Sequence, residues 1–393
     1  MTYRRAKFKL ALEQIIVFPF MLAGKLYGKI IPLKHPTNLF LFFPNADIGG
    51  APRVNADIAK CTQDAKPIIV FSKKSTNNKF LPLYKMKGVS ILDLHRLIDQ
   101  KIFHFINFFY RGVLASWINK AENPVVFGGE SLYFYKVIPH IRKNIPCIEL
   151  SHLPTWLPYN IGFIDRIDQR IFSTKKLQET VETQYKENKL PEKYFKKLSF
   201  IDNAIDIPEI IQQENEQLQV VFIGRGAPQK RVHLITAMAK ILNDQKENVH
   251  FTFVGDVENA ICTNDFPFCS FLGNIHDEKK MNEIYATSDA LILTSAFEGL
   301  PLVVMTMMAY GKPVISTAVN AIPDYVIHDK NGLLITETDE NKIVEQGVMS
   351  LQMLSKNRHL LKTLGENSRA IAIQKFSREN FCNAYRKILI PVI

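Results

Sequence analysis

The stretch Glu298–Thr317 contains the residue types in this chain that could most directly do chemistry. A carboxylate and a glycine follow the apolar run Ala290–Thr294, and a proline then opens a short apolar helix that Gly311 would end. A strand–loop–helix corner of this kind is where open parallel sheets hold ligands. Free amides at a helix N-terminus suit a phosphate, glycine permits close approach, and a carboxylate can accept hydrogen bonds from sugar hydroxyls. The segment therefore predicts a nucleotide-sugar site.

A second candidate element, Gly224–Lys230, follows the first strand predicted in the second half of the chain. A glycine turn leaves room for a diphosphate, and Arg225 and Lys230 supply positive charge that suits such a group. Backbone groups near Gly255, which ends another predicted strand, could contact a nucleotide base. Taken singly, Gly224–Lys230 is more often an ordinary surface turn with solvated charges, and a buried turn explains Gly255 equally well. The occurrence of the Glu298 element about seventy residues later is what favours a site.

The first half of the chain offers two weaker candidates. Gly49 and Gly50 follow a predicted strand and, with Pro52 at a helix start, would let a ligand approach the backbone. A plain strand-to-helix turn explains the same residues. His152 follows Glu149-Leu150-Ser151, where a strand end would direct its side chain toward a ligand cleft, although a lone histidine is more often structural.

Together these elements resemble the signature of family-4 glycosyltransferases (glycosyltransferase group 1), which are retaining enzymes of the GT-B fold. The resemblance covers roughly residues 38–380 and is closer in the second half. It implies that Arg225 and Lys230 bind the donor diphosphate, that Glu298 and His152 contact the donor sugar, and that the glycine loop of the first half faces diphosphate and acceptor. The implied catalytic residues are Glu298, His152, Arg225 and Lys230, and the implied donor-binding residues are Gly49, Gly50, Gly224, Arg225, Lys230, Gly255, Glu298, Gly299, Leu300 and Thr306.

The chain departs from the family pattern at Thr306, where the family has a second glutamate that is thought to contact the ribose diol. A threonine hydroxyl cannot make the same bidentate, charge-assisted contact. A catalytically weak relative that acts as a binding or assembly subunit in a glycan pathway therefore stays an alternative. A dinucleotide-dependent enzyme is a further alternative, but no intact GxGxxG with a following ribose-binding acid occurs.

The sequence predicts no metal site and no cofactor. Metal-dependent sugar transferases of the other main fold hold a divalent ion with an Asp-x-Asp pair, and this chain has none. Arg225, Lys230 and helix amides could neutralise the diphosphate instead. We therefore expect a metal-independent transfer from a nucleotide-diphosphate sugar to a glycan or lipid-linked acceptor.

Short apolar runs alternate with longer amphipathic ones from Asn38 onward, which predicts an α/β fold with parallel sheets. The length of 393 residues and a polar, acidic break favour two Rossmann-like, doubly wound domains facing a central cleft. The predicted divisions are an N-terminal acceptor-binding domain with a basic amphipathic start (1–206), a linker (207–218), a nucleotide-sugar-binding domain (219–376) and a C-terminal helix that could return to the N-terminal domain (377–393).

The net charge of +11 is concentrated in residues 1–35, which hold seven basic residues and one acid, Glu13. The apolar run Ile15–Gly24 in this segment has ten residues, whereas a membrane span needs about 20. An in-plane amphipathic anchor drawn to anionic lipids is one interpretation. A cleavable signal, and a basic first helix packed on the N-terminal domain, are the others. The aromatic stretch Ile102–Tyr110 favours a membrane-facing surface, although a buried core helix explains it too.

These features predict a cytoplasmic protein held peripherally at the inner face of the cell membrane. Nucleic acid is not an expected partner, because the positive excess lies on an aliphatic segment rather than on a recognition module. The cysteines are scattered, with no CxxC pair, and so predict neither a disulfide framework nor a zinc site, which suits a reduced setting. They are Cys61, Cys147, Cys262, Cys269 and Cys382.

Overall fold

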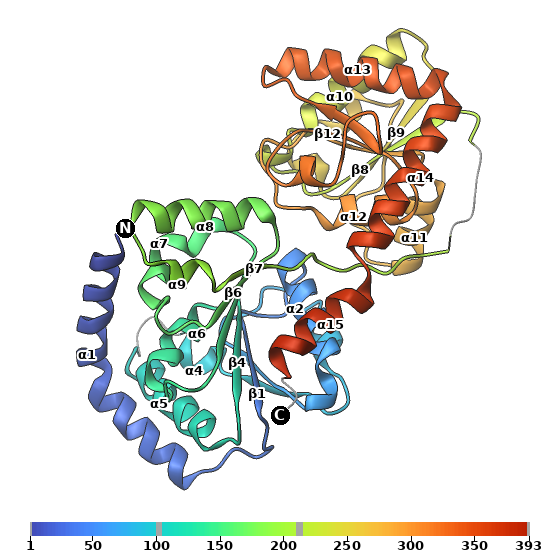
Figure 1. Cartoon of the computed structure of the whole chain (residues 1–393). Helices are drawn as coiled ribbons and strands as arrows, with labels where there is room; N and C mark the ends of the chain where they lie inside the picture. Colours follow the sequence, from blue (N-terminus) through green and yellow to red (C-terminus); the bar gives the residue numbers. More distant parts are fainter. Residues whose placement is uncertain (1, 100–103, 210–214, 391–393) are drawn as a thin grey trace. The chain divides into compact units, whose positions relative to one another are not determined.

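The computed structural model describes residues 2–99, 104–209 and 215–390. The chain divides into two compact units, coloured along the sequence in Figure 1. The first unit contains Met1–Asn203 and Glu379–Ile393, and the second contains Ala204–Arg378. The last helix of the chain therefore packs in the unit that the first half of the chain builds.

The first unit is built on a seven-stranded parallel sheet in the order β3-β2-β1-β4-β5-β6-β7. Helices cover both faces of this sheet (Figure 1), so its central strands are buried on both sides and consist of continuous apolar runs. The strands are β1 Leu39–Phe43, β2 Ile68–Phe71, β3 Ser90–Asp93, β4 Val125–Gly129, β5 Cys147–Ser151, β6 Gln169–Phe172 and β7 Leu198–Phe200. The helices are α1 Tyr3–Ile30, α2 Gly50–Cys61, α3 Leu81–Tyr84, α4 His95–Ile98, α5 His104–Lys120, α6 Leu132–Val137, α7 Leu157–Asn160, α8 Lys175–Glu187, α9 Glu192–Phe195 and the returning α15 Arg378–Leu389.

The second unit has a six-stranded parallel sheet in the order β10-β9-β8-β11-β12-β13. Its strands are β8 Leu218–Ile223, β9 Val249–Val254, β10 Ser270–Phe271, β11 Ala290–Leu293, β12 Val314–Thr317 and β13 Gly332–Ile335. Its helices are α10 Val232–Asp244, α11 Glu278–Thr287, α12 Leu302–Ala309, α13 Glu340–Lys356 and α14 Arg358–Lys375. The predicted α/β class and parallel sheets are thus confirmed.

Most strands begin and end within one or two residues of the predicted apolar runs. Two short strands at or near sheet edges, β7 and β10, were not predicted, because two or three half-buried residues give no apolar run. The first two residues of the aromatic stretch Ile102–Tyr110, and residues 210–214 of the predicted linker, lie outside the described residues.

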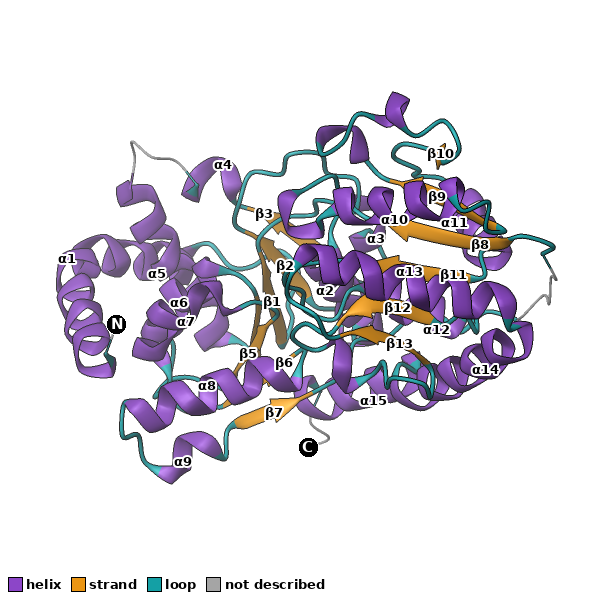
Figure 2. Cartoon of the chain, turned by 90° about the horizontal axis from the view of Figure 1, so that it is seen from above, coloured by secondary structure: helices purple, strands orange, loops and turns teal. Residues whose placement is uncertain are grey.

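Helix α1 is a single helix of 28 residues that lies beside α5, as Figure 2 shows. The two helices approach closely where glycines face backbone. A Cβ built on Gly24 would lie 1.9 Å from the carbonyl oxygen of Phe109, and one built on Gly112 would lie 2.0 Å from that of Met21. Only glycine permits this approach, so the packing of the first helix on the N-terminal domain is encoded by these residues.

The apolar part of α1 is longer than the predicted ten residues. By length and composition, α1 is the one helix in the described ranges that could cross a membrane. The predicted run of ten residues is part of a longer helix, with Leu10 and Leu12 before it and Leu26 after it. One face packs on α5, while Phe8, Leu12, Ile15, Ile16 and other large apolar side chains are exposed on the outside.

The prediction of no disulfide was also wrong at one pair of cysteines. Cys61, at the end of α2, is bonded to Cys382 on α15. The two are 321 residues apart in the sequence, and only the return of α15 to the first unit brings them together. Arg386 on the same helix also pairs with Asp64, at 2.6 and 2.7 Å.

Candidate functional site

In each unit the candidate residues follow strands at the place where the strand order reverses. In the second unit, β8 lies between β9 and β11. The three strands are parallel, so the loops that follow them all begin at the same, carboxyl end of the sheet. In the first unit, β1 has the same position between β2 and β4. Such switch points are where open α/β sheets bind ligands.

Lys230 and Glu298 form a direct ion pair across the loops that follow β8 and β11. Their side chains are only 12% and 8% exposed, so the pair is largely removed from solvent. The hydroxyl of Ser295 also donates to the Glu298 carboxylate, at 2.6 Å. The Glu298 amide donates to the side-chain oxygen of Asn320, at 3.1 Å. The carboxylate is thus fixed beside a cation.

Side chains and backbone groups that the sequence did not single out lock the two loops together. Arg231 has a left-handed backbone (φ 47°), and its guanidinium donates to the carbonyl oxygens of Thr294 and Ser295. The Thr294 hydroxyl donates back to the carbonyl oxygens of Lys230 and Arg231. These reciprocal contacts hold Lys230 and Glu298 in place. A single arginine in one loop and a single threonine in another gave no specific sequence signal for these contacts.

The glycines of the Gly224–Gly226 turn have a packing role. Gly255, with φ +122°, lies so near that a Cβ on it would be 1.8 Å from the Gly224 carbonyl oxygen. A Cβ on Gly226 would lie 2.2 Å from the Asp256 carbonyl oxygen, and the Gly226 amide donates to the Asp256 carboxylate at 2.9 Å. These glycines bring the ends of β8 and β9 together. Arg225 projects from this turn and is exposed.

The two residues after Glu298 have different surroundings, since free space surrounds Gly299 and protein atoms cover Leu300. A Cβ on Gly299 would meet nothing within 4 Å, whereas Leu300 is buried. Helix α12 then begins after Pro301. Thr306, on the second turn of this helix, donates its hydroxyl hydrogen to the carbonyl oxygen of Leu302, at 2.9 Å. The Thr306 side chain is therefore bonded to its own helix.

In the first unit, Asp47 shapes the glycine loop. Its Oδ1 accepts the Ser75 hydroxyl and the amides of the following residues, Thr76 at 2.8 Å and Asn77 at 2.9 Å among them. Burial opposes ionisation of Asp47, but these hydrogen bonds prevail and lower its pKa. Nothing lies within 4 Å of a Cβ built on Gly50, so the start of α2 is open.

His152 is held by Glu130, a residue that the sequence analysis missed. The amides of His152 and Leu153 both donate to Oε1 of Glu130, the latter at 3.1 Å. Glu130 has a left-handed backbone (φ 57°) at the end of β4, and burial raises its pKa to about 7. Burial also lowers the pKa of His152 to about 4, so its ring is neutral near pH 7. Within the described part of the chain, the buried Nε2 of His152 has no hydrogen-bond partner.

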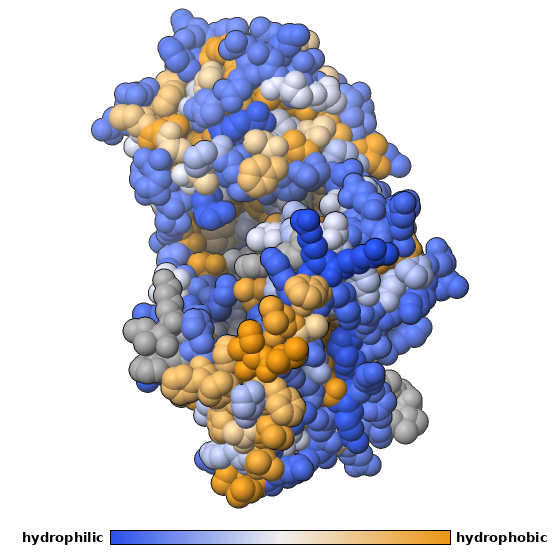
Figure 3. Space-filling model, turned by 90° about the vertical axis from the view of Figure 1, so that its left-hand side faces the viewer, coloured by the Kyte–Doolittle hydropathy of each residue, from blue (hydrophilic) through white to orange (hydrophobic). Residues whose placement is uncertain are grey.

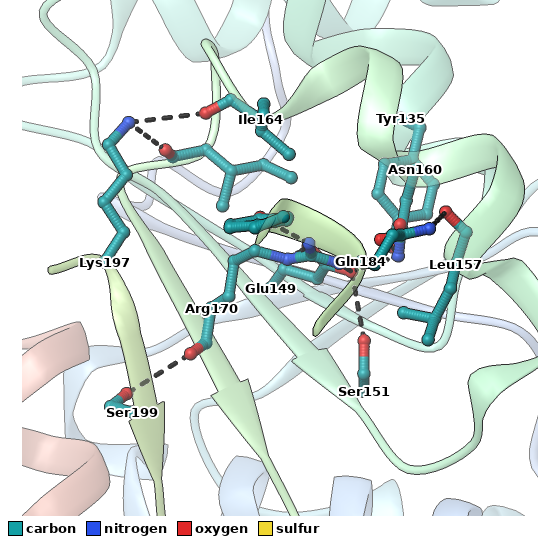
Figure 4. Close-up of polar contacts among 12 residues, drawn as sticks. Tyr135, Glu149, Ser151, Leu157, Asn160, Ile164, Arg170, Gln184, Lys197 and Ser199 are labelled. Atoms are coloured by element: carbon teal, nitrogen blue, oxygen red, sulfur yellow. Dashed lines mark hydrogen bonds and ion pairs between the residues drawn. The ribbon is translucent and has the colours of Figure 1, made fainter. Parts of the chain in front are cut away.

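A buried ion pair supports the strand that leads to His152 (Figure 4). Glu149 on β5 and Arg170 on β6 are each 1% exposed and meet at 2.7 Å. Glu149 also accepts hydrogen bonds from Tyr135 (2.6 Å), Ser151 (3.0 Å) and Asn160 (2.8 Å). This network fixes the end of β5 immediately before His152.

The structure thus brings Lys230 and Glu298 into contact, with Gly224, Arg225 and Gly255 on the adjoining strand ends. Gly49, Gly50 and His152 belong to the other unit and form a separate set. In the described ranges, no group of three or more His, Cys, Asp or Glu side chains lies where it could hold a metal ion.

Comparison with protein families finds a match over residues 217–352 to the family described as "Glycosyl transferases group 1". An uncharacterised glycosyltransferase of Methanocaldococcus jannaschii is 29% identical over 215 residues, which are 52% of this chain and 57% of that protein. The N-acetyl-alpha-D-glucosaminyl L-malate synthase of Bacillus anthracis is 28% identical over 46% of this chain and 47% of its own length. The capsular polysaccharide biosynthesis glycosyltransferase CapM of Staphylococcus aureus is 25% identical over 49% and 47%. The chain therefore spans about half the length of the curated relatives it matches.

Solved structures match over nearly the whole chain. HepE of Anabaena, in complex with UDP and glucose, superposes with a TM-score of 0.69 at 15% identity and covers 91% of this chain and 100% of its own. The pneumococcal O-GlcNAc transferase GtfA, in complex with UDP and GlcNAc, has a TM-score of 0.73 at 12% identity and covers 91% and 99%. At these identities the likeness concerns the fold.

Proposed function

We propose that the chain is a retaining glycosyltransferase, which the match of residues 217–352 to the group 1 glycosyltransferases and the likeness of its fold to HepE and GtfA support. It moves a sugar from a nucleotide-diphosphate sugar to a glycan or lipid-linked acceptor. The observation that carries the proposal is the Lys230–Glu298 contact at the switch point of the second sheet. UDP in the two similar structures makes a uridine nucleotide the first donor to test, and the name of CapM supports a polysaccharide pathway.

The adjacent charges match the adjacent groups of such a donor. In the proposed mechanism, Glu298 accepts hydrogen bonds from the donor sugar while Lys230 and Arg225 bind the neighbouring diphosphate. The bond between the anomeric carbon and the diphosphate oxygen breaks, and the acceptor hydroxyl attacks on the same face, which retains configuration. The acceptor proton passes to the departing diphosphate. Lys230 and Arg225 stabilise the negative charge that develops there, so the step requires no metal ion.

The first unit offers its own candidate residues for contacts with the substrates. Neutral His152 has an Nε2 available for a hydrogen bond with a sugar hydroxyl. The backbone at Gly50 is open, so a substrate group could approach it closely. Backbone near Gly255 contacts the base.

We further propose that the enzyme works as a peripheral protein at the cytoplasmic face of the membrane. The outer surface of α1 exposes large apolar side chains along its length, and Figure 3 shows an extended hydrophobic patch on this face of the molecule. Arg4, Arg5 and Lys29 are exposed near the two ends of the helix. An apolar face with basic ends suits an in-plane helix on an anionic membrane.

The donor site is tested by thermal unfolding with UDP, GDP, ADP and TDP. A nucleotide present at a hundred times its Kd stabilises the native state by about 2.7 kcal/mol, which is about 5–11 °C for a unit of this size. Stabilisation should be lost in Arg225→Ala and Lys230→Ala but kept in Lys240→Ala, which removes an exposed lysine of α10.

Transfer should be abolished in Arg225→Ala and in Glu298→Ala, and full activity in either would refute the assignment. A wild-type protein that responds to no nucleotide would instead favour the binding or assembly subunit. The intrahelical hydrogen bond of Thr306 is the observation that favours this second candidate, because that hydroxyl is already engaged.

A further inference from the structure

A pocket of about 530 Å³ lies between α1 and α5, within the first unit and on elements that carry none of the proposed donor-site residues. Leu12, Ile16 and Val17 of α1 and Phe108 of α5 provide its apolar lining. Leu12 and Ile16 are also half exposed at its mouth. The pocket is within the size range of small-molecule sites, and it opens on the apolar face of α1.

Glycine positions explain why the pocket exists. The two helices touch closely around Gly24, Gly28 and Gly112, where side chains would collide with the facing backbone or side chains. The pocket-lining residues 9–17 and 107–111 precede these close contacts on both helices. The space is therefore a built feature of the helix pair.

The floor of the pocket is charged and partly buried. Arg111 is 5% exposed, and its guanidinium donates to Glu13 at 2.7 Å and to Asn107 at 3.0 Å. Lys136 from α6 donates to both oxygens of Glu13, at 2.7 and 2.9 Å. Two cations thus share one carboxylate, which leaves a positive excess in a partly buried place.

A positive charge removed from water lowers its free energy by acquiring an anionic partner. Burial lowers the pKa of Lys136, and burial together with the charges of Arg111 and Lys25 lowers the pKa of nearby His140 to about 4. Lys9 also lines the pocket and adds a further positive charge. The combination of an apolar wall, an apolar mouth and a cationic floor suits an anion that carries a hydrocarbon tail.

We propose that this pocket binds the phosphate and adjoining glycerol of an anionic phospholipid, with its acyl chains lying along the exposed apolar face of α1. Arg111 and Lys136 bind the phosphate, and Leu12 and Ile16 contact the chain. The proposal rests on the membrane contact proposed above, and it turns a general attraction to anionic membranes into recognition of single lipid molecules.

Short-chain lipids test whether single lipid molecules bind in the pocket, because below their micelle concentration they offer no membrane surface. Dihexanoyl-phosphatidylglycerol, kept below its micelle concentration, should bind the full-length protein saturably with one molecule per chain in a calorimetric titration. Dihexanoyl-phosphatidylcholine and inorganic phosphate should bind at least about tenfold more weakly, since one lacks net charge and the other lacks the tail. Equal binding of phosphatidylcholine, equal binding of free phosphate, or no binding of phosphatidylglycerol would each overturn the proposal.

Matched variants test the residues. Lys136→Met leaves Arg111 and Glu13 as a neutral pair, and it should weaken phosphatidylglycerol binding about tenfold or more. Lys143→Met removes the same charge from an exposed position of the first unit outside the pocket lining and outside α1, and it should change the affinity by less than about twofold. Equal losses in the two variants would mean that only the net charge matters.

A third variant distinguishes lipid binding in the pocket from simple insertion of the apolar face of α1 into a membrane. Ile16→Trp would fill the pocket mouth while making the face of α1 more apolar. The proposal predicts weaker binding of the short-chain lipid, whereas a featureless membrane-inserting surface predicts unchanged or tighter binding to phosphatidylglycerol vesicles and no effect on the soluble lipid. None of these readouts contains a sugar donor. Failure of the transferase assignment would leave them intact, and their failure would leave nucleotide binding at Arg225 and Lys230 intact.

Discussion

Arg170 should be one of the most costly single residues to replace in the first unit. In Arg170→Met the side chain keeps much of its volume, but Glu149 becomes a carboxylate in a fully buried place without its cation. Only neutral donors remain around it, from Tyr135, Ser151 and Asn160. Removing one member of a buried ion pair leaves the other charge uncompensated.

The expected loss follows from that burial. Breaking a buried pair of this kind costs about 3–5 kcal/mol, which for a domain of this size lowers Tm by about 6–20 °C. Adding Glu149→Gln should restore part of the stability at pH 8, since the uncompensated charge is then absent.

Tryptophan fluorescence during urea unfolding measures this effect in the correct unit, because both tryptophans, Trp117 and Trp156, belong to it. The exposed Arg142 provides a control, and Arg142→Met should change the free energy of unfolding by no more than about 0.5 kcal/mol. A loss below about 1 kcal/mol in Arg170→Met, or no recovery in the double variant, would refute the reasoning.

Three further predictions concern other contacts. Burial raises the Glu130 pKa above its unfolded value, so its contribution to stability is full below about pH 4.5 and is lost as pH rises through about 7; Glu130→Gln should flatten the dependence of Tm on pH between 5 and 8, and an unchanged slope would contradict this. Gly112→Leu places side-chain atoms on the Met21 carbonyl and should cost about 1–3 kcal/mol while making α1 sensitive to limited proteolysis; a protected α1 would show that the helices do not need the close approach. Replacing Cys61 and Cys382 by serine should destabilise the first unit by about 2–5 kcal/mol in non-reducing buffer, and a reductant should lower the wild-type unfolding midpoint to that of the variant.

Much of the sheet architecture could be predicted because buried parallel strands are continuous apolar runs, as Leu39–Phe43 and Ala290–Leu293 illustrate. The proximity of Lys230 and Glu298 could be expected as well, because each follows a strand and the two strands are neighbours. The role of Glu130 could not be predicted, since it depends on a left-handed backbone and on amides of another loop.

The N-terminal helix shows a different limit of sequence patterns. Apolar side chains surround α1 on nearly all sides, so periodicity does not reveal which side packs on α5. The glycines Gly24, Gly28 and Gly112 determine that side, but they become informative only when the facing backbone is known. The Cys61–Cys382 bond was unpredictable for a related reason, because it depends on where the final helix of the chain returns.

That return has a consequence for how the protein is made. Tyr385 of α15 is buried and meets the ring of Phe127 on β4, so the core of the first unit contains residues that are synthesised only after the whole second unit. At about 5–20 residues per second, roughly ten to forty seconds separate synthesis of the last strand of this unit from synthesis of its last helix. During that interval the second unit can fold as an uninterrupted segment, while the first exposes the apolar surface that α15 will cover. The nascent first unit should therefore depend on chaperones for longer than its place at the start of the chain suggests, and a stop codon before Phe381 would leave it permanently in that unfinished form.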